Sequence, residues 1–391
     1  MYIDLRYRPK DDVVCKFHVE ATDLKKAAEA LAAESSIGTW TDVRITSRIR
    51  RMRARVFKID FREKEVWIAY PLALFEPGNI PQLLSTVAGN IFGMKIVRSL
   101  RLEDILFPRK YVKSFKGPRY GIDGVRRLLR VKKRPLVGTI VKPKLGLKTK
   151  EHAKVAFEAW VGGCDLVKDD ENLTNQSFNP FKERVVETLK ARDAAERETG
   201  ERKAYLPNIT APYDEMVKRL DFVKAHGGRY VMVDVLTVGF SALQEVRKTS
   251  LAIHAHRAMH AAITRGKQGI SMRVLAKLCR LAGVDQLHIG TVFGKMEGGR
   301  KEVLNVRDAL TERGLKTVFP VCSGGLHPAL VSRLVKLLGN DITIQMGGGI
   351  HAHPQGTMAG ARAARQAIDL SLGIIDRVPK ELKEALRKWK T

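Results

Sequence analysis

The chain has 391 residues, with 70 Lys and Arg against 42 Asp and Glu, which gives a formal net charge of +28. This length exceeds one small domain and suits a barrel of about 250 residues with a second domain. Hydrophobic residues make up 44% of the chain, which excludes a disordered or collagen-like protein. Because no apolar run reaches the roughly 18–20 residues of a membrane helix, and the first residues lack the apolar core of a signal peptide, we expect a soluble cytoplasmic protein.

The positive charge raises binding to nucleic acid or to an anionic membrane as a hypothesis. In the basic segment 48–55, three arginines alternate with apolar residues, a pattern typical of a strand with one solvent-exposed face. The chain carries no nucleic-acid-binding motif, so we expect no specific nucleic-acid partner and no membrane partner. A basic surface that maintains solubility and steers an anionic substrate is the simpler interpretation. Four scattered cysteines indicate neither a disulfide framework nor a zinc site.

Residues 1–115 predict an α+β domain in which strands and helices are mixed. The expected strands span residues 12–20, 43–48, 55–60 and 65–70, and the expected helices span 24–33 and 81–88. Residues 106–121 contain Pro108, Pro118 and several glycines, and form the expected linker.

From residue 116 to residue 391, short apolar runs alternate with helical patterns. Eight strand-like runs span residues 136–141, 165–168, 205–210, 230–235, 251–256, 286–289, 318–322 and 342–346. Between the first two, Ala153, Ala156, Phe157 and Trp160 recur at the spacing of one apolar helix face. These alternations predict an α/β fold, a (β/α)8 TIM barrel that ends in C-terminal helices.

In such barrels the active site lies at the carboxyl ends of the strands. Six of the predicted strands end in polar or glycine residues, namely 142–144, 168–171, 254–257, 288, 323–325 and 347–349. Each group alone has an ordinary structural explanation, since a lone histidine is usually a satisfied structural residue and a charge run is usually solvated. Their joint occurrence at equivalent places predicts a single site.

The chemistry of these residues points to a metal and to phosphates. Asp170 and Glu171 offer the hard oxygen ligands that Mg²⁺ prefers. Lys168 points to the same face as Asp170, but an ammonium group cannot bind a cation, so the residues alone make it a counter-charge. The glycines after the last two strands suit a phosphate, and Arg257 and His288 could hold a second anion. We infer a Mg²⁺-dependent enzyme that acts on a doubly phosphorylated small molecule, with lysines that suit an enediolate.

Glycines also flank Lys295 within residues 290–299, the pattern of a mobile lid. With these motifs in place, the chain resembles the large subunit of ribulose-1,5-bisphosphate carboxylase/oxygenase (RuBisCO). The resemblance covers nearly the whole chain and rests on residues 34–40, 89–93, 138–147, 162–172, 254–260, 288–298 and 323–328. The sequence of the histidine motif at 254–256 is most similar to that of the archaeal form III branch.

The resemblance implies how the catalytic residues divide the work. Lys168 would be carbamylated by a non-substrate CO₂ and, with Asp170 and Glu171, would bind Mg²⁺. The carbamate would take the C3 proton of ribulose-1,5-bisphosphate. Lys142 would act as an acid and base near the enediolate and protonate the final carbanion, and His256 would relay protons at the hydrated intermediate.

The remaining site residues would bind or stabilise the substrate. Lys295 would stabilise the incoming carboxylate, and Lys144 would support the enediolate. The phosphates would be held by Thr39, Trp40, Gly347 and Gly348 at one end and by Arg257 and His288 at the other, while Ser323, Gly324, Gly325 and Gln345 would also bind substrate, and Glu34 and Asn90 would come from a neighbouring subunit.

The expected function is therefore a ribulose-1,5-bisphosphate carboxylase and oxygenase that uses CO₂ and O₂ and gives two 3-phosphoglycerate, either in a carbon-fixing cycle or in nucleotide salvage. A homodimer, alone or within a larger assembly, is the expected active unit, and no small subunit is expected. One alternative is a RuBisCO-like enolase or isomerase, against which the presence of Lys295, His288, Glu34 and Asn90 argues. Another is an anion- or nucleic-acid-binding barrel without catalysis, which would not need the complete metal-ligand set.

Overall fold

The computed structural model describes residues 1–38, 45–293 and 299–389. These residues form two compact units. The N-terminal unit consists of Met1–Gly117, Met259–Ala282 and Arg313–Leu315, and the barrel unit consists of Pro118–Ala258, Gly283–Glu312 and Lys316–Thr391. Residues 259–282, which the sequence pattern placed with the barrel, thus group with the N-terminal unit. Within the described ranges, the structure contains no helix that is both long enough and apolar enough to cross a membrane.

The N-terminal unit is built on a five-stranded sheet in the order β10-β4-β1-β3-β2. Its strands are β1 (Val13–Glu20), β2 (Arg55–Asp60), β3 (Glu65–Tyr70), β4 (Ser99–Leu106) and β10 (Gly269–Ile270). The first four pair antiparallel, and β10 runs parallel to β4. Along β1, buried Cys15, Phe17 and Val19 alternate with partly exposed residues, so one face of the strand contributes to the core.

Helices of the N-terminal unit accompany this sheet. They are α1 (Leu24–Glu34), α2 (Ser47–Arg50), α3 (Ile80–Val87), α4 (Arg109–Val112), α10 (His260–Thr264) and α11 (Met272–Ala282), with 3-10 turns η1 (Leu72–Leu74) and η2 (Asn90–Gly93). The predicted helices at 24–33 and 81–88 and the predicted strands at 12–20, 55–60 and 65–70 are confirmed.

Three features of this unit differ from the prediction. Segment 48–55, whose alternation indicated a strand, instead forms most of helix α2 and a turn, and only Arg55 belongs to β2. The described end of the predicted strand 43–48 enters helix α2, because Thr46 Oγ1 accepts a hydrogen bond from Ile49 N (3.3 Å) and caps that helix. Strand β4 was not predicted, and it extends to Leu106, where the linker was expected to begin. Its apolar alternation is interrupted by a β-bulge, since the pairing with β1 skips Glu103.

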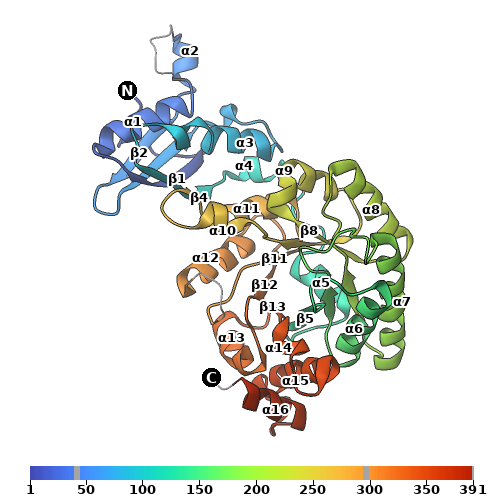
Figure 1. The fold of residues 1–391 in the computed structure, drawn as a ribbon. Coiled ribbons are helices and arrows are strands. Elements are labelled where there is room, and N and C mark those ends of the chain that lie inside the picture. Colours follow the sequence, from blue (N-terminus) through green and yellow to red (C-terminus); the bar gives the residue numbers. More distant parts are fainter. Residues whose placement is uncertain (39–44, 294–298, 390–391) are drawn as a thin grey trace. The chain divides into compact units, whose positions relative to one another are not determined.

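The barrel unit contains eight parallel strands in the order β7-β6-β5-β13-β12-β11-β9-β8 (Figure 1). They are β5 (Leu136–Ile140), β6 (Leu166–Lys168), β7 (Ala204–Leu206), β8 (Tyr230–Asp234), β9 (Ala252–His256), β11 (Gln286–His288), β12 (Phe319–Ser323) and β13 (Thr343–Gln345). A bridge between Asn208 and Met232 joins the β7 and β8 ends of this order and closes the ring. All eight predicted strands, and the predicted barrel, are confirmed.

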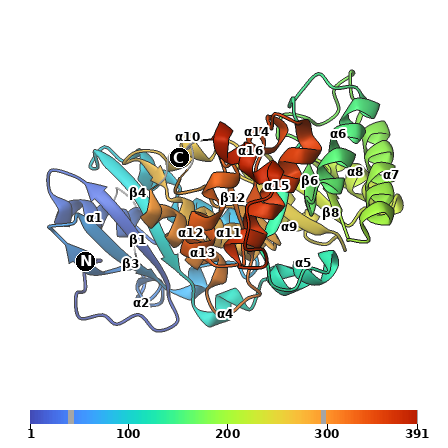
Figure 2. The same ribbon diagram turned by 90° about the horizontal axis from the view of Figure 1, so that it is seen from below.

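Helices surround the ring of strands. They are α5 (Gly121–Leu129), α6 (Thr149–Val161), α7 (Phe181–Thr199), α8 (Tyr213–Ala225), α9 (Val235–Val246), α12 (Arg300–Thr311), α13 (Val331–Leu338), α14 (Gly348–His351), α15 (Gly356–Ser371) and α16 (Lys380–Lys388), with the 3-10 turn η3 (Pro328–Leu330). Helices α6, α7 and α8 lie together on one side of the ring in both views (Figures 1 and 2). The predicted apolar face of α6 is confirmed, because Ala153, Ala156 and Trp160 are buried.

Helix α5 closes one end of the barrel. Its residues Ile122, Val125 and Leu129 share one apolar cluster with the first residues of six strands. Those first residues are Leu136, Leu166, Ala204, Tyr230, Ala252 and Phe319. Because parallel strands all begin at the same end, α5 covers their amino ends and leaves the carboxyl ends for a functional site.

Candidate active site

The predicted strand-end residues gather at the carboxyl end of the barrel. Strand β6 ends in Lys168, β9 in His256, β11 in His288 and β12 in Ser323, and Lys142 follows β5. Neighbouring strands are parallel and paired in register, so their ends lie at one mouth. The polar side chains in this mouth are largely buried, and each therefore needs a partner within the protein or a ligand.

Lys168 lies with its amine enclosed by the barrel, and its side chain is 1% exposed. Its Nζ donates a hydrogen bond to the Asp169 carbonyl oxygen (2.9 Å) and lies 3.3 Å from Met232 Sδ. Glu171 Oε2 lies 3.9 Å from Nζ. Burial lowers the pKa of Lys168 from 10.5, although the charges of Glu171 and Asp170 act in the opposite direction. At a given pH, the neutral form of the amine is therefore more populated here than on an exposed lysine.

Asp170 is the buried carboxylate of the mouth. Its Oδ2 accepts a hydrogen bond from Lys142 Nζ (2.7 Å), and its Oδ1 accepts from Asn172 N (3.2 Å) and Nδ2 (3.1 Å). Burial alone would raise the pKa of Asp170, but the hydrogen bond and charge of Lys142 hold it below 3.8. The group is ionised at neutral pH and is suited to bind a cation.

The donor set of this mouth is one anionic ligand short of a metal site. Over residues 1–38, 45–293 and 299–389, the structure contains no group of three or more His, Cys, Asp or Glu that could hold a metal ion. Asp170 and Glu171 supply two carboxylates, and Lys168 Nζ lies 3.9 Å from the second. A carbamate on that nitrogen would add the missing oxygen anion, which makes the residues fit a hard cation such as Mg²⁺.

Asp169 was not among the predicted site residues, yet it fixes the strand end that carries them. Its Oδ2 accepts hydrogen bonds from Arg184 Nε (3.2 Å) and from Asn208 N (2.9 Å). Its Oδ1 accepts from the Tyr205 hydroxyl (2.6 Å), and His152 Nε2 lies 3.2 Å away. The period of a strand could have indicated this role, since a residue between two inward-facing residues faces the surrounding helices.

The ends of β7 and β8 contribute two more residues that were not predicted. Asn208 Nδ2 donates a hydrogen bond to the Glu171 carbonyl oxygen (3.1 Å) and so fixes that backbone. Asp234, the last residue of β8, accepts at Oδ1 from His256 Nδ1 (2.8 Å), and His256 Nε2 lies 3.8 Å from Glu171 Oε2. A polar residue at the end of an apolar run was the available signal for Asp234.

Two further histidine contacts cross the mouth. His254 Nε2 lies 2.9 Å from His288 Nε2, and His288 Nδ1 lies 2.6 Å from Ser323 Oγ. Burial lowers the pKa of His254 to about 3 and also lowers the pKa of His288 well below 6.5. Both rings are therefore neutral at pH 7, and both nitrogens of His288 have partners within the barrel.

Arg257 and several glycines supply the features that suit anions. Arg257 is 7% exposed, and burial lowers its pKa to about 10, which leaves it cationic at neutral pH. A Cβ atom on Gly290 would lie 2.7 Å from Arg257 Nη2 and would push the guanidinium aside, and the positive φ of +86° also favours glycine here. Gly324 and Gly325 also adopt positive φ angles, of 113° and 82°, directly after β12.

Strand β13 leads into the second glycine turn. Gln345 ends the strand, and its buried Oε1 has no hydrogen-bond partner among the residues that the structure describes. Such an acceptor is expected where a polar ligand binds. A Cβ atom on Gly347 would lie 3.3 Å from Lys142 Cε, so this turn faces the lysine, and Gly348 begins α14. Lys144 is exposed in the loop between β5 and α6.

Five further predicted site residues belong to the N-terminal unit or lie outside the described residues. Thr39, Trp40 and Lys295 lie outside the described residues. Glu34, at the end of α1, and Asn90, at the start of η2, belong to the N-terminal unit, where they line one polar pocket. That unit therefore brings these two residues together although 56 positions separate them in the sequence.

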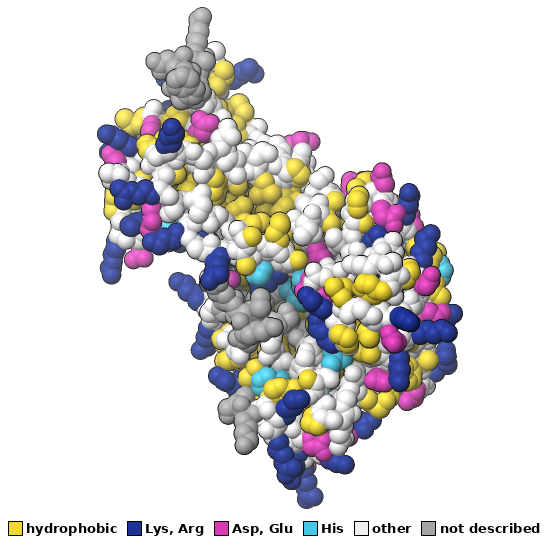
Figure 3. Space-filling model, viewed as in Figure 1, with side chains coloured by type: hydrophobic (Ala, Val, Ile, Leu, Met, Phe, Trp, Pro, Cys, Tyr) yellow, Lys and Arg dark blue, Asp and Glu magenta, His cyan; other side chains and the backbone are white. Residues whose placement is uncertain are grey.

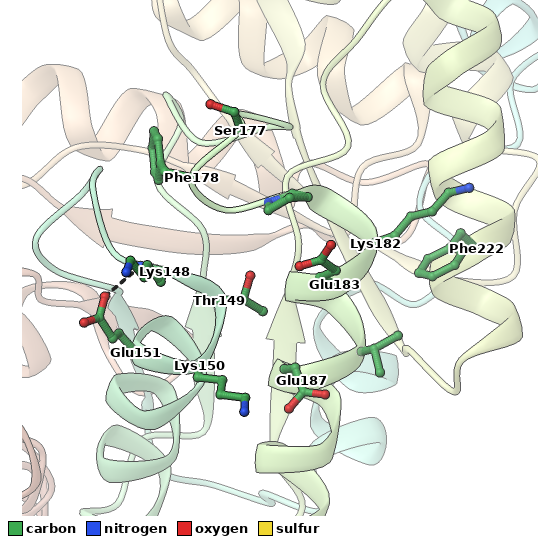
Figure 4. Close-up of a pocket in the computed structure, with 12 residues that line it drawn as sticks. Lys148, Thr149, Lys150, Glu151, Ser177, Phe178, Lys182, Glu183, Glu187 and Phe222 are labelled. Atoms are coloured by element: carbon green, nitrogen blue, oxygen red, sulfur yellow. Dashed lines mark hydrogen bonds between the residues drawn. The ribbon is translucent and has the colours of Figure 1, made fainter.

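A groove on the barrel unit lies beside the first turns of α6 and α7 (Figure 4). Its charged lining residues are Lys148, Lys150, Lys182, Glu151, Glu183 and Glu187. These charges cancel, so the groove does not favour a doubly anionic ligand, and none of the predicted site residues lines it. On the face shown in Figure 3, Lys and Arg side chains are likewise spread among acidic ones and form no single patch.

Family models and curated relatives match this chain over nearly its whole length. The model of the ribulose bisphosphate carboxylase large chain, catalytic domain, matches residues 121–389, and the model of the N-terminal domain matches residues 1–111. A ribulose bisphosphate carboxylase of Methanocaldococcus jannaschii is 52% identical and aligns over 100% of both chains. One of Pyrococcus furiosus is 48% identical over 99% of this chain and 97% of the relative.

Solved structures agree with this result. A sulfate complex of octameric RuBisCO from Pyrococcus horikoshii superposes with a TM-score of 0.95 at 46% identity and covers 99% of this chain and 96% of that one. Dimeric RuBisCO from Hyperthermus butylicus gives a TM-score of 0.94 at 44% identity, with 99% and 98% covered. The fold, the motifs and these relatives agree, and the chain belongs to the ribulose bisphosphate carboxylase large-chain family.

Proposed function

We propose that this chain is a ribulose-1,5-bisphosphate carboxylase and oxygenase that joins CO₂ to ribulose-1,5-bisphosphate and releases two molecules of 3-phosphoglycerate. The observation that carries the proposal is the buried Lys168, whose Nζ lies 3.9 Å from Glu171 and beside the ionised Asp170. A binding protein has no need of this costly arrangement of buried charges. A metal-dependent enzyme that is activated at the lysine does need it.

Lys168, Asp170 and Glu171 are the residues that we assign to Mg²⁺. The neutral amine of Lys168 would attack CO₂, a C–N bond would form, and one proton would leave the nitrogen for solvent, which turns a neutral amine into an oxygen anion. When bound, the metal would polarise the substrate carbonyl and stabilise the enediolate. Lys142, now 2.7 Å from Asp170, would exchange that carboxylate for a place beside the substrate.

Residues of the mouth can carry the proton transfers. We assign removal of the C3 proton to the carbamylated side chain of Lys168. Asp234 holds Nδ1 of His256 at 2.8 Å, so Nε2 is the nitrogen that can relay protons at the hydrated intermediate. Lys142 protonates the final carbanion, and Lys144 adds positive charge near the enediolate.

The two ends of the mouth match a substrate with two phosphates. Gly347 and Gly348, with Thr39 and Trp40, are assigned to one phosphate and Arg257 to the other, while His288, whose two nitrogens already have partners within the barrel, contributes by orienting Ser323. Ser323, Gly324, Gly325 and Gln345 are assigned to the substrate between them. The buried acceptor on Gln345 and the close approach of Gly290 to Arg257 support this division. Lys295 is assigned to the carboxylate formed when CO₂ adds.

We also propose a homodimer, alone or within a larger assembly of dimers, as the active form. The relative from Hyperthermus butylicus is dimeric and that from Pyrococcus horikoshii is octameric. Glu34 and Asn90 line a polar pocket of the N-terminal unit and are assigned to the site of the neighbouring subunit.

Product analysis tests the proposed reaction. The protein is incubated with CO₂ and Mg²⁺, and then given ribulose-1,5-bisphosphate and labelled bicarbonate. The expected products are two 3-phosphoglycerates for each substrate consumed, one of them labelled. Consumption or isomerisation of the substrate without label would instead indicate an enolase or isomerase, and unchanged substrate would indicate a binding protein. The Lys168→Ala variant should form no product.

A further inference from the structure

His288 and Ser323 form the end of a longer hydrogen-bonded chain that starts inside the barrel. At its start, Gln286 Nε2 donates a hydrogen bond to Thr343 Oγ1 (3.1 Å). Gln286 Oε1 lies 3.2 Å from His254 Nδ1. From there the chain passes through His254 Nε2 and His288 Nε2, 2.9 Å apart, to Ser323. Thr343, Gln286 and His254 are all 0% exposed, so bulk solvent does not reach these bonds.

The residues of this hydrogen-bonded chain come from four adjacent strands. The sheet order places β13, β12, β11 and β9 side by side, and these strands carry Thr343, Ser323, Gln286 and His254. Gln286 pairs directly with His254 in the parallel register. Strand positions hold side chains more rigidly than loops, so the geometry of the chain is built into the barrel wall.

The amide of Gln286 determines which atom donates and which accepts in each hydrogen bond of this hydrogen-bonded chain. One end of an amide only donates hydrogen bonds and the other end only accepts them. Because Nε2 donates to Thr343, Oε1 must accept from His254, and the proton of this neutral ring is therefore on Nδ1. His254 Nε2 is then an acceptor, and His288 Nε2 must carry the proton that it accepts. His288 Nδ1 is left as an acceptor for the Ser323 hydroxyl, 2.6 Å away.

We propose that Gln286, held by Thr343, is a positioning residue that sets the tautomers of His254 and His288 and so fixes the direction of the Ser323 hydroxyl. The hydroxyl has one proton and gives it to His288, so Ser323 presents only lone pairs to the substrate. It would accept a hydrogen bond from a substrate hydroxyl group and would discriminate against a ligand with only a carbonyl oxygen there. This choice of ligand rests on the proposed function, whereas the order of tautomers does not.

Nitrogen NMR of protein labelled with ¹⁵N-histidine reads the tautomers directly, in the substrate-free protein. We expect His254 protonated at Nδ1 and His288 protonated at Nε2. Gln286→Met keeps the length of the side chain but removes the acceptor, and should mix the tautomers of both rings. Gln286→Glu keeps an oxygen toward His254 and should retain the native tautomers. Thr343→Val frees the amide to rotate and should behave like Gln286→Met.

The KM and kcat supply a second measurement, which a purely structural role of Gln286 would leave unchanged. Loss of a partner that orients a ligand-binding group typically costs about 10–100-fold in affinity or activity. We expect the KM for ribulose-1,5-bisphosphate to rise about 10-fold in Gln286→Met, with a smaller change in kcat, and to be largely restored in Gln286→Glu.

Thr188→Val is the matched control, because Thr188 is buried in α7 and its hydroxyl has no partner among the described residues. It should alter neither the tautomers nor the KM. The inference is overturned if the parent protein shows the opposite tautomers, or if Gln286→Met leaves both tautomers unchanged. A parent protein with the expected tautomers but no carboxylase activity would overturn the proposed function and still support this inference.

Discussion

At the scale of single residues, the proposed carbamate on Lys168 would couple the binding of two activators, CO₂ and Mg²⁺. A carbamate on its Nζ places a third negative charge beside Asp170 and Glu171, the latter 3.9 Å away. Three anions in a buried mouth repel one another unless a cation lies between them. In the proposed site, Mg²⁺ would therefore stabilise the carbamate, and the carbamate would complete the ligand set for Mg²⁺. Binding of CO₂ and of Mg²⁺ should each strengthen the other by the same factor.

Activity should accordingly depend on preincubation with CO₂ and Mg²⁺ together, and on the pH of that step. Only the neutral amine reacts with CO₂, so activation should speed up as the pH rises toward the pKa of Lys168. Since burial lowers this pKa, activation should level off below pH 10.5. Initial carboxylation rates after preincubation at a series of pH values, assayed at one common pH, measure this. Activation that is independent of CO₂, or full activity in Lys168→Ala, would contradict it.

Arg257 can be tested without changing the arginine itself. In Gly290→Ala the new Cβ would lie 2.7 Å from Arg257 Nη2 and must displace the guanidinium. A lost hydrogen bond to a charged group typically costs about 1.5–3 kcal/mol, so the KM for the bisphosphate should rise about 10–100-fold while kcat changes less. Steady-state kinetics measure this. Gly200→Ala is the control, because Gly200 also has a positive φ (+68°) but open space around it. Equal effects in both variants would show backbone strain, not loss of the arginine.

The sequence indicated where the site residues stand but not which partners they have. Lys168, Asp170 and His256 could be found because each follows an apolar run and all such ends meet in a barrel. Asp234, which lies 2.8 Å from His256, was missed. The sequence pattern indicates where each strand ends but gives no distances between residues on different strands. For the same reason the chain from Gln286 to Ser323, which links residues 37 positions apart, could not be read from the sequence.

At the scale of elements, the prediction succeeded where burial dominates and failed where local hydrogen bonds do. All eight barrel strands were found, because strands covered on both faces appear as continuous apolar runs. Strand β4 was missed, because the bulge at Glu103 shifts the phase of its alternation. The described part of segment 43–48 was assigned to a strand, but the Thr46 cap favours helix α2, whose residues are not buried. Alternation without burial is therefore a weak sign of a strand.

At the scale of elements, Asp169 connects the end of strand β6 to neighbouring elements, and its loss should destabilise the protein. It joins β6 to Arg184 of α7 and to Tyr205 of β7. Asp169→Asn removes one partner of a buried ion pair, which typically lowers the free energy of unfolding by about 3–5 kcal/mol. Denaturant unfolding of both proteins measures this. Asp308→Asn is the control, because its pair with Arg307 is exposed and such pairs are worth about 1 kcal/mol or less.

The pH dependence of that difference follows from the pKa of Asp169. Burial alone would raise this pKa, but Arg184, His152 and Tyr205 hold it well below 3.8. A carboxyl group with a lowered folded-state pKa stabilises the protein fully above its unfolded pKa, and this stabilisation is lost as the pH falls. The difference in the free energy of unfolding between the parent protein and Asp169→Asn should thus be largest at pH 7 and decrease below about pH 4. A gap that is constant or widens in acid would contradict the ion-pair assignment.

At the scale of the whole molecule, the residues that we propose to be functional are divided between two units. Lys168 and the other strand-end residues belong to the barrel unit, and Glu34 and Asn90 belong to the N-terminal unit. If the N-terminal unit of one subunit completes the barrel site of its neighbour, one chain carries parts of two different sites. A substitution in either unit then inactivates a different site of the dimer, and the two defects can be separated.

Mixing two inactive variants tests this division. Glu34→Gln keeps an intact barrel, and Lys168→Ala keeps an intact Glu34. In a two-fold symmetric dimer formed from equal amounts of both, about half of the dimers are hybrids, and each hybrid has one site with an unaltered Glu34 and an unaltered Lys168. After subunit exchange, confirmed by native mass spectrometry, about a quarter of the parental carboxylase activity should return. Each variant mixed with itself is the control and should stay inactive. If hybrids form and no activity returns, Glu34 acts within its own subunit, because then every site in the mixture retains one of the two defects.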